Sequence, residues 1–332
     1  MLHLLPGSFI LIRHLFAKRR RFAASRFLKH FVFLLVVCCW MLPLTAEAAP
    51  LAEGGEAVEV AQDATPSDSE LMLVDGRQVE FAVTRAPQAR ATVVFENGLM
   101  LPMSTWQAVR SSLADSFHTV TYNRAGVGRS AMAPDPQPPQ SSVGDGLLAL
   151  LKSQQLDPPY ILVGHSLGGQ YAQLFASLHP DLVSGLVLVD ALPVGTVKPA
   201  AEFPWFTRWG LWLFAPEYAR REIANIHPMG EALLAAARLE GRPVVRLVAH
   251  SQATAPKAEG LVKDLLKGVV LAEDFGVWAV DPEVAERRMD ELYPQSIVKP
   301  VQAHHRVQEL APELVVEAIR QVAGCCPVPL AR

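Results

Sequence analysis

The sequence is poor in several features that would otherwise direct its interpretation. It contains only four cysteines in 332 residues: Cys38 and Cys39 lie in an apolar run near the N-terminus, and Cys325 and Cys326 are adjacent near the C-terminus. Adjacent cysteines rarely bridge each other without strain. A disulfide framework is therefore not predicted, and the fold must be held by its hydrophobic core. A redox or dimer contact is the alternative role for the C-terminal pair.

The sequence also lacks an excess of charge of either sign. The formal net charge is −3, without long runs of like charge after the N-terminal region, which argues against nucleic acid as a partner. Neither Cys-x-x-Cys nor His-Glu-x-x-His occurs, and no internal repeat is evident, so neither a metal site nor a cofactor is predicted. Hydrophobic residues, by contrast, make up 50% of the chain, which is enough for the core of one full-sized domain.

Residues 1–48 have the three-part order of a secretory signal peptide. A basic segment at 18–21 precedes an apolar run at 31–44, and the small residues Ala46 and Ala48 follow at the positions that a signal peptidase requires. The apolar run is short for a membrane span, which needs about 20 residues. We therefore expect an exported protein, periplasmic or secreted. An uncleaved N-terminal membrane anchor is the alternative, which the long basic region favours.

After this segment the chain changes from a tether to a folded domain. Residues 49–70 are small, acidic and non-aromatic, and they predict a flexible tether. Within 71–324, apolar runs alternate with helical patterns such as 167–178 and 312–323. The strands are expected at 71–75, 78–85, 91–98, 118–124, 160–166, 185–191, 243–250 and 296–304. Several of these are continuously apolar, as strands covered on both faces should be. The alternation predicts an α/β fold with a mostly parallel eight-stranded sheet, whose first two strands form an antiparallel edge through the Asp75-Gly76 turn.

The stretch YILVGHSLGG at 160–169 places a serine between an apolar strand and a helix. Gly164 and Gly168 flank Ser166 at the −2 and +2 positions. A nucleophilic serine at so sharp a turn has a strained backbone, and its neighbours must be nearly free of side chain so that strand and helix can pass closely. The five-residue pattern alone is weak. Its position at the end of a predicted strand favours a nucleophile elbow over a glycine-rich turn with an idle serine.

With these residues the chain resembles the α/β-hydrolase superfamily, in particular its serine esterase and lipase-like members. The resemblance covers roughly 70–323, with the motifs in the family's order. VVFENG at 93–98 matches the strand that leads into the oxyanion loop, and TYNRAGVGRS at 121–130 looks like the family's D-x-R-G-x-G-x-S turn, with Asn123 in place of the aspartate. The resemblance implies an α/β-hydrolase fold, a helical cap inserted after the sixth strand, and a catalytic triad in the order Ser, acid, His.

The base implied by the resemblance follows Ser166 in the chain. His304 and His305 lie between the last predicted strand and the last predicted helix, where the family places its base. Counted back from Pro312, His305 matches the family's H-x-x-x-x-x-x-P phrase, so His305 is preferred to His304. The other histidines after the serine, which are placed less suitably, are His179, His227 and His250. His165 is expected to be a packing residue at the elbow.

The acid of the triad is less well marked. Many members of the family carry it just after the seventh strand, but the loop SQATAPKAEG at 251–260 contains no aspartate. Asp190, at the end of the sixth strand, occupies a position that some members use instead, and it is our preferred candidate; a capping role in the loop is the alternative. Asp274 and Asp281 would serve if the loop after the seventh strand is long.

The oxyanion of an acyl-transfer reaction needs two backbone donors. The elbow supplies the N–H of Leu167. The second is expected from the loop after VVFENG, where the N–H of Leu99 is the best candidate because Gly98 lets the loop fold over the site. The side chain of Asn97 could add a further donor.

Residues 193–240 form the insertion that corresponds to the cap. Six aromatic residues fall within 203–214. This density predicts an apolar lid over an acyl pocket, with core packing or contact with a membrane surface as the alternatives.

Together these patterns predict an exported serine hydrolase that cleaves apolar carboxylic esters through an acyl-enzyme intermediate. Its partner is a small-molecule ester, and a membrane is involved only if the N-terminal segment stays as an anchor. The alternatives on the same triad are lactone or amide hydrolysis and cofactor-free perhydrolysis. From a different class, a catalytically silent binding protein with the same fold also fits the pattern.

Overall fold

The structure is a computed structural model and describes residues 68–133, 138, 144–236, 239–249 and 276–325. The chain divides into two compact units, Met1–Val60 and Ala61–Arg332, and every described residue belongs to the second. The predicted signal peptide, most of the predicted tether and Cys326 lie outside the described residues.

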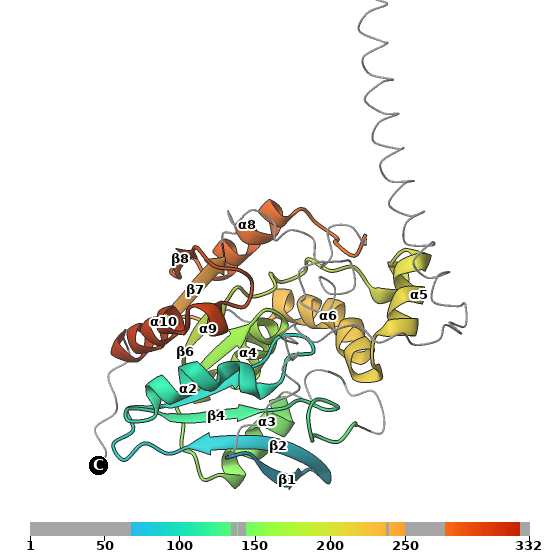
Figure 1. Cartoon of the computed structure of the whole chain (residues 1–332). Coiled ribbons are helices and arrows are strands. Elements are labelled where there is room, and N and C mark those ends of the chain that lie inside the picture. Colours follow the sequence, from blue (N-terminus) through green and yellow to red (C-terminus); the bar gives the residue numbers. More distant parts are fainter. Residues whose placement is uncertain (1–67, 134–137, 139–143, 237–238, 250–275, 326–332) are drawn as a thin grey trace, which may run out of the picture. The chain divides into compact units, whose positions relative to one another are not determined.

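An eight-stranded sheet in the order β1-β2-β4-β3-β5-β6-β7-β8 forms the centre of the described domain (Figure 1). Its strands are β1 (Glu70–Val74), β2 (Arg77–Thr84), β3 (Thr92–Glu96), β4 (His118–Tyr122), β5 (Tyr160–His165), β6 (Val183–Val189), β7 (Val244–Ala249) and β8 (Ile297–Val301). The strands from β4 to β8 pair in parallel, whereas β1 with β2 and β2 with β4 pair antiparallel. The predicted mostly parallel sheet is therefore confirmed.

The edge hairpin turns at the predicted dipeptide. Val74 pairs with Arg77, and the two residues between them, Asp75 and Gly76, have φ angles of 50° and 75°. Two consecutive positive φ values define the type I′ turn, whose twist matches that of the flanking strands and which favours Asp-Gly.

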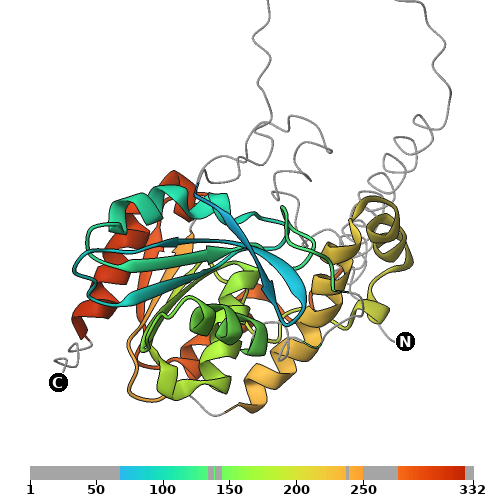
Figure 2. The ribbon, with the colours of Figure 1, turned by 90° about the horizontal axis from the view of Figure 1, so that it is seen from below.

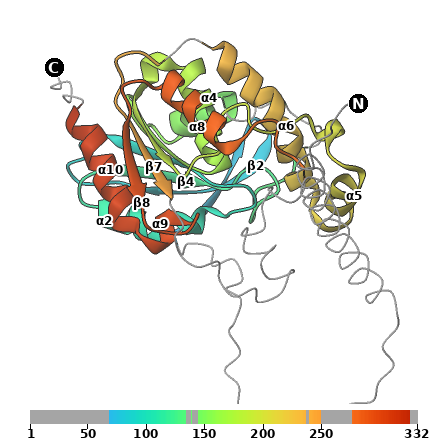
Figure 3. The ribbon, with the colours of Figure 1, turned by 90° about the horizontal axis from the view of Figure 1, so that it is seen from above.

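Helices cover both faces of the sheet. The described helices are α2 (Gln107–Leu113), α3 (Gly146–Ser153), α4 (Leu167–Leu178), α5 (Trp205–Phe214), α6 (Glu217–Ala235), α8 (Pro282–Leu292), α9 (Val307–Leu310) and α10 (Pro312–Cys325), with 3-10 turns η1 (Met103–Trp106), η3 (Pro180–Leu182) and η4 (Ala200–Glu202). Figures 2 and 3 show α2 and α10 on one face of the sheet and α4 on the other. Each layer has its own apolar core, with Leu113 and Ile319 in one and Leu150 and Phe175 in the other.

The chain between β6 and β7 contains η4, α5 and α6, in the region expected to form the cap. Most of the large apolar side chains of α5 are exposed, including Trp205 at 67% and Trp212 at 66%. Only Thr207 of this helix is buried, so packing in a core does not account for its aromatic residues. Among the described residues, no helix is both long enough and apolar enough to cross a membrane.

Candidate active site

Ser166 lies at the sharp turn between β5 and α4. Its backbone has φ 51° and ψ −121°, a conformation that a residue with a side chain adopts only when its surroundings impose it. Two hydrogen bonds impose it here: the Ser166 N–H donates to the carbonyl of Val189 at 3.1 Å, and its carbonyl accepts from Leu192 N–H at 3.0 Å. The predicted elbow is therefore present, and strand β6 holds it in place.

The glycines around Ser166 are needed for space. A Cβ atom on Gly164 would lie 2.4 Å from the carbonyl oxygen of Gly168, and a Cβ on Gly168 would lie 2.3 Å from the carbonyl oxygen of Glu96. Both distances are too short for any side chain. The close approach predicted from the sequence thus brings the first turn of α4 against β5 and against the end of β3.

Asp190 and His305, which are 115 residues apart in the chain, meet beside the elbow. The Nδ1 atom of His305 lies 2.6 Å from Oδ2 of Asp190. The other carboxylate oxygen of Asp190 accepts the N–H of Ala249 at 3.0 Å. Because an ionised carboxylate only accepts hydrogen bonds, Nδ1 of His305 carries the proton and Nε2 is left as an acceptor. This is the tautomer that a general base of the triad requires.

The neighbouring histidine takes a different position. His304 is exposed, whereas His305 is half-buried and makes the contact with Asp190. His179 ends α4 and packs its ring on Phe175, and His227 lies in α6, where its Nδ1 is 3.1 Å from the carbonyl of Val197. His250 lies outside the described residues. The structure thus brings His305, rather than His304, against the candidate acid.

The alternative acids are not brought to His305 by any described contact. Asp281 caps the N-terminus of α8, where its side chain accepts the N–H of Glu283 at 2.9 Å. Its role there is structural. Asp274 lies outside the described residues.

The two candidate oxyanion donors lie on segments that touch. Leu167 is the first residue of α4, and Leu99 follows Gly98 in the loop after β3. A Cβ on Gly168 would lie 2.4 Å from the carbonyl oxygen of Asn97, so this loop runs against the first turn of α4. The loop turns sharply, with Leu101 N–H donating to the carbonyl of Gly98 at 3.2 Å.

The side chain of Asn97 does not have the role expected from the sequence. Its Nδ2 donates to the carbonyl of Tyr122 at 2.8 Å, and its Oδ1 accepts the indole N–H of Trp106 at 2.9 Å. The residue is buried. Its amide therefore ties the loop after β3 to β4 and η1, and the expectation of an additional oxyanion donor is corrected.

His165 is buried as expected, but it also contacts the loop of the candidate base. Its Nε2 lies 2.7 Å from the carbonyl oxygen of His305, and the two rings are 4.6 Å apart. Burial, together with the nearby His305 and Arg306, lowers the pKa of His165 to about 3. The neutral ring donates from Nε2 to the carbonyl and so holds His305 beside the elbow. Nothing in the sequence pattern pointed to this contact across 140 residues.

A second group that the sequence did not assign surrounds Arg124, just after β4. The guanidinium contacts the carboxylates of Glu222 and Glu96 and the carbonyls of Asn97 and Gly98 in the loop after β3. Burial raises the pKa of Glu96 to about 7, against the opposing attraction of Arg124. Arg124 stands in the motif at 121–130, which was the signal available, whereas Glu222 is 98 residues away in α6 and carries no motif.

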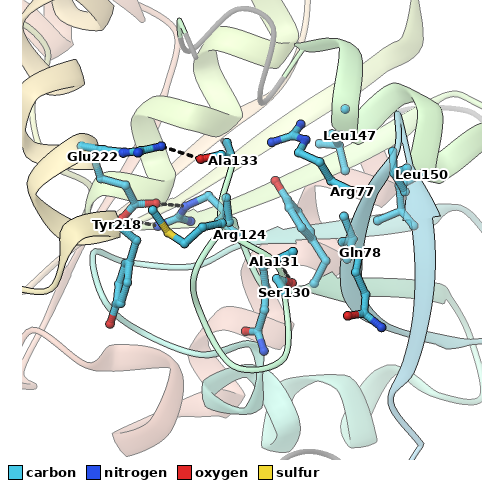
Figure 4. A pocket seen from close by; sticks show the side chains of 18 of the residues that line it. Arg77, Gln78, Arg124, Ser130, Ala131, Ala133, Leu147, Leu150, Tyr218 and Glu222 are labelled. Atoms are coloured by element: carbon cyan, nitrogen blue, oxygen red, sulfur yellow. Dashed lines mark hydrogen bonds and ion pairs between the residues drawn. The ribbon is translucent and has the colours of Figure 1, made fainter. Parts of the chain in front are cut away.

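A cavity lies beside this group, and Figure 4 shows the side chains that line it. Its volume is about 100 Å³. Its lining includes Arg77, Arg124, Tyr171, Tyr218 and Glu222. Ser166, Asp190 and His305 are not part of the lining. The lining of this cavity thus includes Arg124 and Glu222 but none of the three candidate catalytic residues.

Acidic, histidine and cysteine side chains do not gather into a metal site in the described part of the chain: no group of three or more could hold an ion.

A mostly parallel sheet with a serine at a sharp strand-to-helix turn is typical of one class of enzyme fold. Comparison with family models identifies the family. Residues 93–318 match the Alpha/beta hydrolase family. This chain belongs to that family.

Several of the similar proteins carry the names of hydrolases. The "Putative carbamate hydrolase RutD" of Yersinia enterocolitica is 36% identical over 115 residues, which are 35% of this chain and 41% of that protein. The mouse "sn-1-specific diacylglycerol lipase ABHD11" is 33% identical over 106 residues, 31% of this chain and 34% of that protein. The chain thus matches about two fifths or less of the length of these relatives.

Solved structures share the fold at low sequence identity. The enol-lactonase from Burkholderia xenovorans superposes with a TM-score of 0.51 and 15% identity, over 77% of this chain and 100% of that chain. A likeness at this sequence identity shows a shared fold and does not indicate the substrate.

Proposed function

We propose that this protein is a serine hydrolase that cleaves apolar carboxylic esters through an acyl-enzyme intermediate. The observation that carries the proposal is the 2.6 Å contact between His305 Nδ1 and Asp190 Oδ2, made beside a serine whose backbone has the positive φ of a nucleophile elbow. The three residues also follow one another in the chain order that α/β-hydrolases use, serine, acid and histidine, which supports the proposal.

In the proposed first half-reaction, Ser166 Oγ attacks the ester carbonyl while Nε2 of His305 takes the hydroxyl proton. Asp190 holds the imidazole by its Nδ1–H and stabilises the positive charge that develops. The N–H groups of Leu167 and Leu99 bind the oxyanion. The alcohol then leaves with the proton from Nε2, and water repeats the sequence on the acyl-enzyme.

The substrate class rests on chemistry rather than on a bound ligand. A serine nucleophile disfavours epoxide and haloalkane substrates, whose hydrolysis in this family uses an aspartate at this position. Esters, lactones, amides and carbamates all suit the proposed machinery, and relatives or neighbours are named for carbamate, lipid and lactone hydrolysis. Apolar esters are preferred because α5 carries exposed tryptophans, which are suited to contact with acyl chains. Perhydrolysis on the same triad and a silent binding protein remain the alternatives.

We also propose that the protein is exported by means of residues 1–48, with an uncleaved membrane anchor as the alternative. The support is the basic, apolar and small-residue order of that segment. Mass spectrometry of the protein from its native host should find an N-terminus at or near Ala49. Intact residues 1–48 in the membrane fraction would favour the anchor.

Ser166→Ala tests the nucleophile. We expect the variant to fold normally and to lose ester turnover by about 10⁴-fold or more, as for other triad members. The measurement is hydrolysis of p-nitrophenyl esters from acetate to palmitate, together with labelling by a fluorophosphonate probe, which reacts only with an activated serine. Unchanged turnover in Ser166→Ala would refute the mechanism, and a wild-type chain that neither labels nor turns over any ester would support the silent binding protein.

The same ester series tests the role of α5. Replacing Trp205, Trp209 and Trp212 by serine should lower turnover of long-chain esters while leaving acetate turnover nearly unchanged, because only a long acyl chain reaches beyond the reacting carbonyl. The matched control replaces Leu71 and Leu73, which are exposed on β1, by serine. Equal effects on acetate and palmitate would remove α5 from the substrate site.

A further inference from the structure

The peptide group between Gly98 and Leu99 is held by a buried arginine. Nη2 of Arg124 donates to the carbonyl of Gly98 at 3.0 Å, and Nη1 donates to the carbonyl of Asn97 at 2.6 Å. Two successive carbonyls of the loop after β3 therefore point at one guanidinium. Because a guanidinium is planar and rigid, two such bonds fix the direction of both carbonyls.

The bond to Gly98 has a consequence for the neighbouring N–H group. The C=O and N–H of a trans peptide point in opposite directions across a planar unit. Fixing the carbonyl of Gly98 on Arg124 therefore directs the N–H of Leu99 away from the guanidinium. A positive charge on the carbonyl oxygen also polarises the peptide, which strengthens its N–H as a donor.

Arg124 is in turn held by the helix of the cap. Its Nε donates to Oε1 of Glu222 at 2.5 Å and its Nη2 to Oε2 at 3.3 Å, the ion pair drawn in Figure 4. The ring of Tyr171, on α4, lies 4.6 Å from the guanidinium carbon. Arg124 and Glu222 are both only 8% exposed. A buried arginine that lost these partners would be strongly destabilising. The guanidinium is therefore expected to stay in the one position where all of these contacts are made.

The charge of this arginine does not depend on pH in the working range. Burial alone would disfavour the cation, but the carboxylate of Glu222 and its hydrogen bonds raise the pKa of Arg124. Glu96 adds a second carboxyl group, with 3.5 Å between its Oε2 and Nη1 of Arg124.

We infer that Arg124 is a positioning residue for the oxyanion hole: it holds the Gly98–Leu99 peptide so that the Leu99 N–H faces the substrate, and Glu222 links that position to cap helix α6. The inference rests on the proposed function, because it concerns a donor that acts only in acyl transfer. Arg124 touches neither the substrate nor the reacting atoms.

Arg124→Ala, Arg124→Lys and Glu222→Gln test the inference. We expect Arg124→Ala to lower kcat by about 10²- to 10³-fold, as for loss of an oxyanion donor, while KM changes little. Arg124→Lys should be intermediate because an ammonium keeps the charge but not the fork of donors. Glu222→Gln keeps one hydrogen bond to the guanidinium and should lose the least.

Two further readouts separate positioning from general damage. The affinity for a trifluoromethyl ketone, which serine converts to a charged tetrahedral adduct, should fall in parallel with kcat/KM. The affinity for a non-reactive ether analogue of the substrate should not change. In addition, guanidinium ion at low millimolar concentration should raise the kcat of Arg124→Ala by about tenfold or more. The adjacent cavity gives the ion access to the position that the side chain has left. Ammonium ion at the same concentration should not raise kcat.

Arg246→Met is the matched control. Arg246 is also buried and pairs with two carboxylates, Glu286 and Asp290, on α8, but it does not contact the oxyanion loop. We expect it to lower the unfolding temperature without a selective loss of kcat or of ketone affinity.

The outcomes are distinguishable. A folded Arg124→Ala with kcat within about threefold of wild type would overturn the inference, as would a lowered kcat with unchanged ketone affinity and no rescue. If Arg124→Ala does not fold, a folded Arg124→Lys decides: full kcat overturns the inference, and a lowered kcat with unchanged KM supports it. Failure of the inference alone leaves wild type active and Ser166→Ala inactive. An inactive wild type defeats the proposed function and the inference with it.

Discussion

Asp190 shows how one side chain can serve both the fold and the candidate site. Its backbone has a φ of 41°, its N–H donates to the carbonyl of Leu247 at 2.7 Å, and its Oδ1 accepts from Ala249 at 3.0 Å. These contacts with β7 fix the carboxylate, so that Oδ2 remains for His305. The capping role and the triad role, which the sequence presented as alternatives, are therefore compatible in a single residue.

We expect Asp190→Asn to fold and to lower turnover by about 10⁴-fold, because an amide favours the wrong tautomer of the histidine.

His305→Ala should be nearly as inactive as Ser166→Ala. The matched control is His304→Ala, one residue away and exposed, which should retain turnover to within a few-fold. Steady-state kinetics on one ester decide the matter. A nearly silent Asp190→Asn would move the acid to another residue.

The contacts of Asn123 explain why this chain departs from the family's motif at that position. It stands where the D-x-R-G-x-G-x-S turn has an aspartate, and its Nδ2 donates to Oε2 of Glu80 at 2.8 Å while its Oδ1 accepts Met103 N–H at 2.7 Å. Glu80 is buried and also accepts from Arg129. A carboxylate at 123 would face that of Glu80, whereas an amide can donate to it. The change to asparagine is thus matched to the glutamate on β2.

At the scale of elements, the site depends on how closely α4 approaches β3. The first turn of α4 lies directly on the carbonyls of Glu96 and Asn97, with no room for a Cβ at Gly168. This contact sets the elbow against the loop after β3, the candidate oxyanion loop. The distance between the two candidate donors is therefore determined by a glycine that takes no part in the chemistry.

Gly168→Ala should consequently destabilise the protein by about 2–4 kcal/mol, because backbone rather than a flexible side chain must shift. It should also lower kcat, since the elbow and the oxyanion loop separate. Gly324→Ala is the matched control: it lies in α10 with nothing within 4 Å of the added atom, and alanine there should be neutral or stabilising by about 1 kcal/mol or less. Urea unfolding and ester kinetics measure both effects. Similar free energies of unfolding for the two variants would contradict the close contact.

At the scale of the whole molecule, two buried groups give stability opposite dependences on pH. The pKa of Glu96 is about 7, above its usual 4.5, so the native state binds more protons than the unfolded state and stability falls as pH rises from 4.5 to 7. The pKa of His165 is about 3, below its usual 6.5, so stability falls as pH decreases from 6.5 to 3. Between pH 4.5 and 6.5 the two slopes oppose each other.

Glu96→Gln removes one of these slopes. Between pH 4.5 and 6.5 we expect the free energy of unfolding of the variant to rise with pH relative to wild type, by at most about 1.4 kcal/mol per pH unit. Urea unfolding at several pH values measures it. Glu317→Gln, on the solvent side of α10, is the control: a hydrogen bond from Lys299 lowers the pKa of Glu317, so the effect of this substitution should not change with pH above about pH 4.5. Parallel profiles for Glu96→Gln and wild type would contradict the raised pKa.

The sequence by itself determined the fold and the centre of the site. Alternating apolar strands and helices predicted the sheet, Asp75-Gly76 predicted its edge turn, and the glycines around Ser166 predicted the elbow, because all three are local patterns in which backbone conformation follows from residue type. The position of His305 followed from the family's motif.

Contacts between distant residues were decided only by the tertiary structure. Asp190 was one of several candidate acids until β6, β7 and the loop after β8 brought it to His305. Arg124 and Glu222 meet across 98 residues, and His165 holds a carbonyl 140 residues away. No periodicity or spacing encodes such pairs, because each depends on how separate elements pack around the elbow rather than on the preferences of either residue.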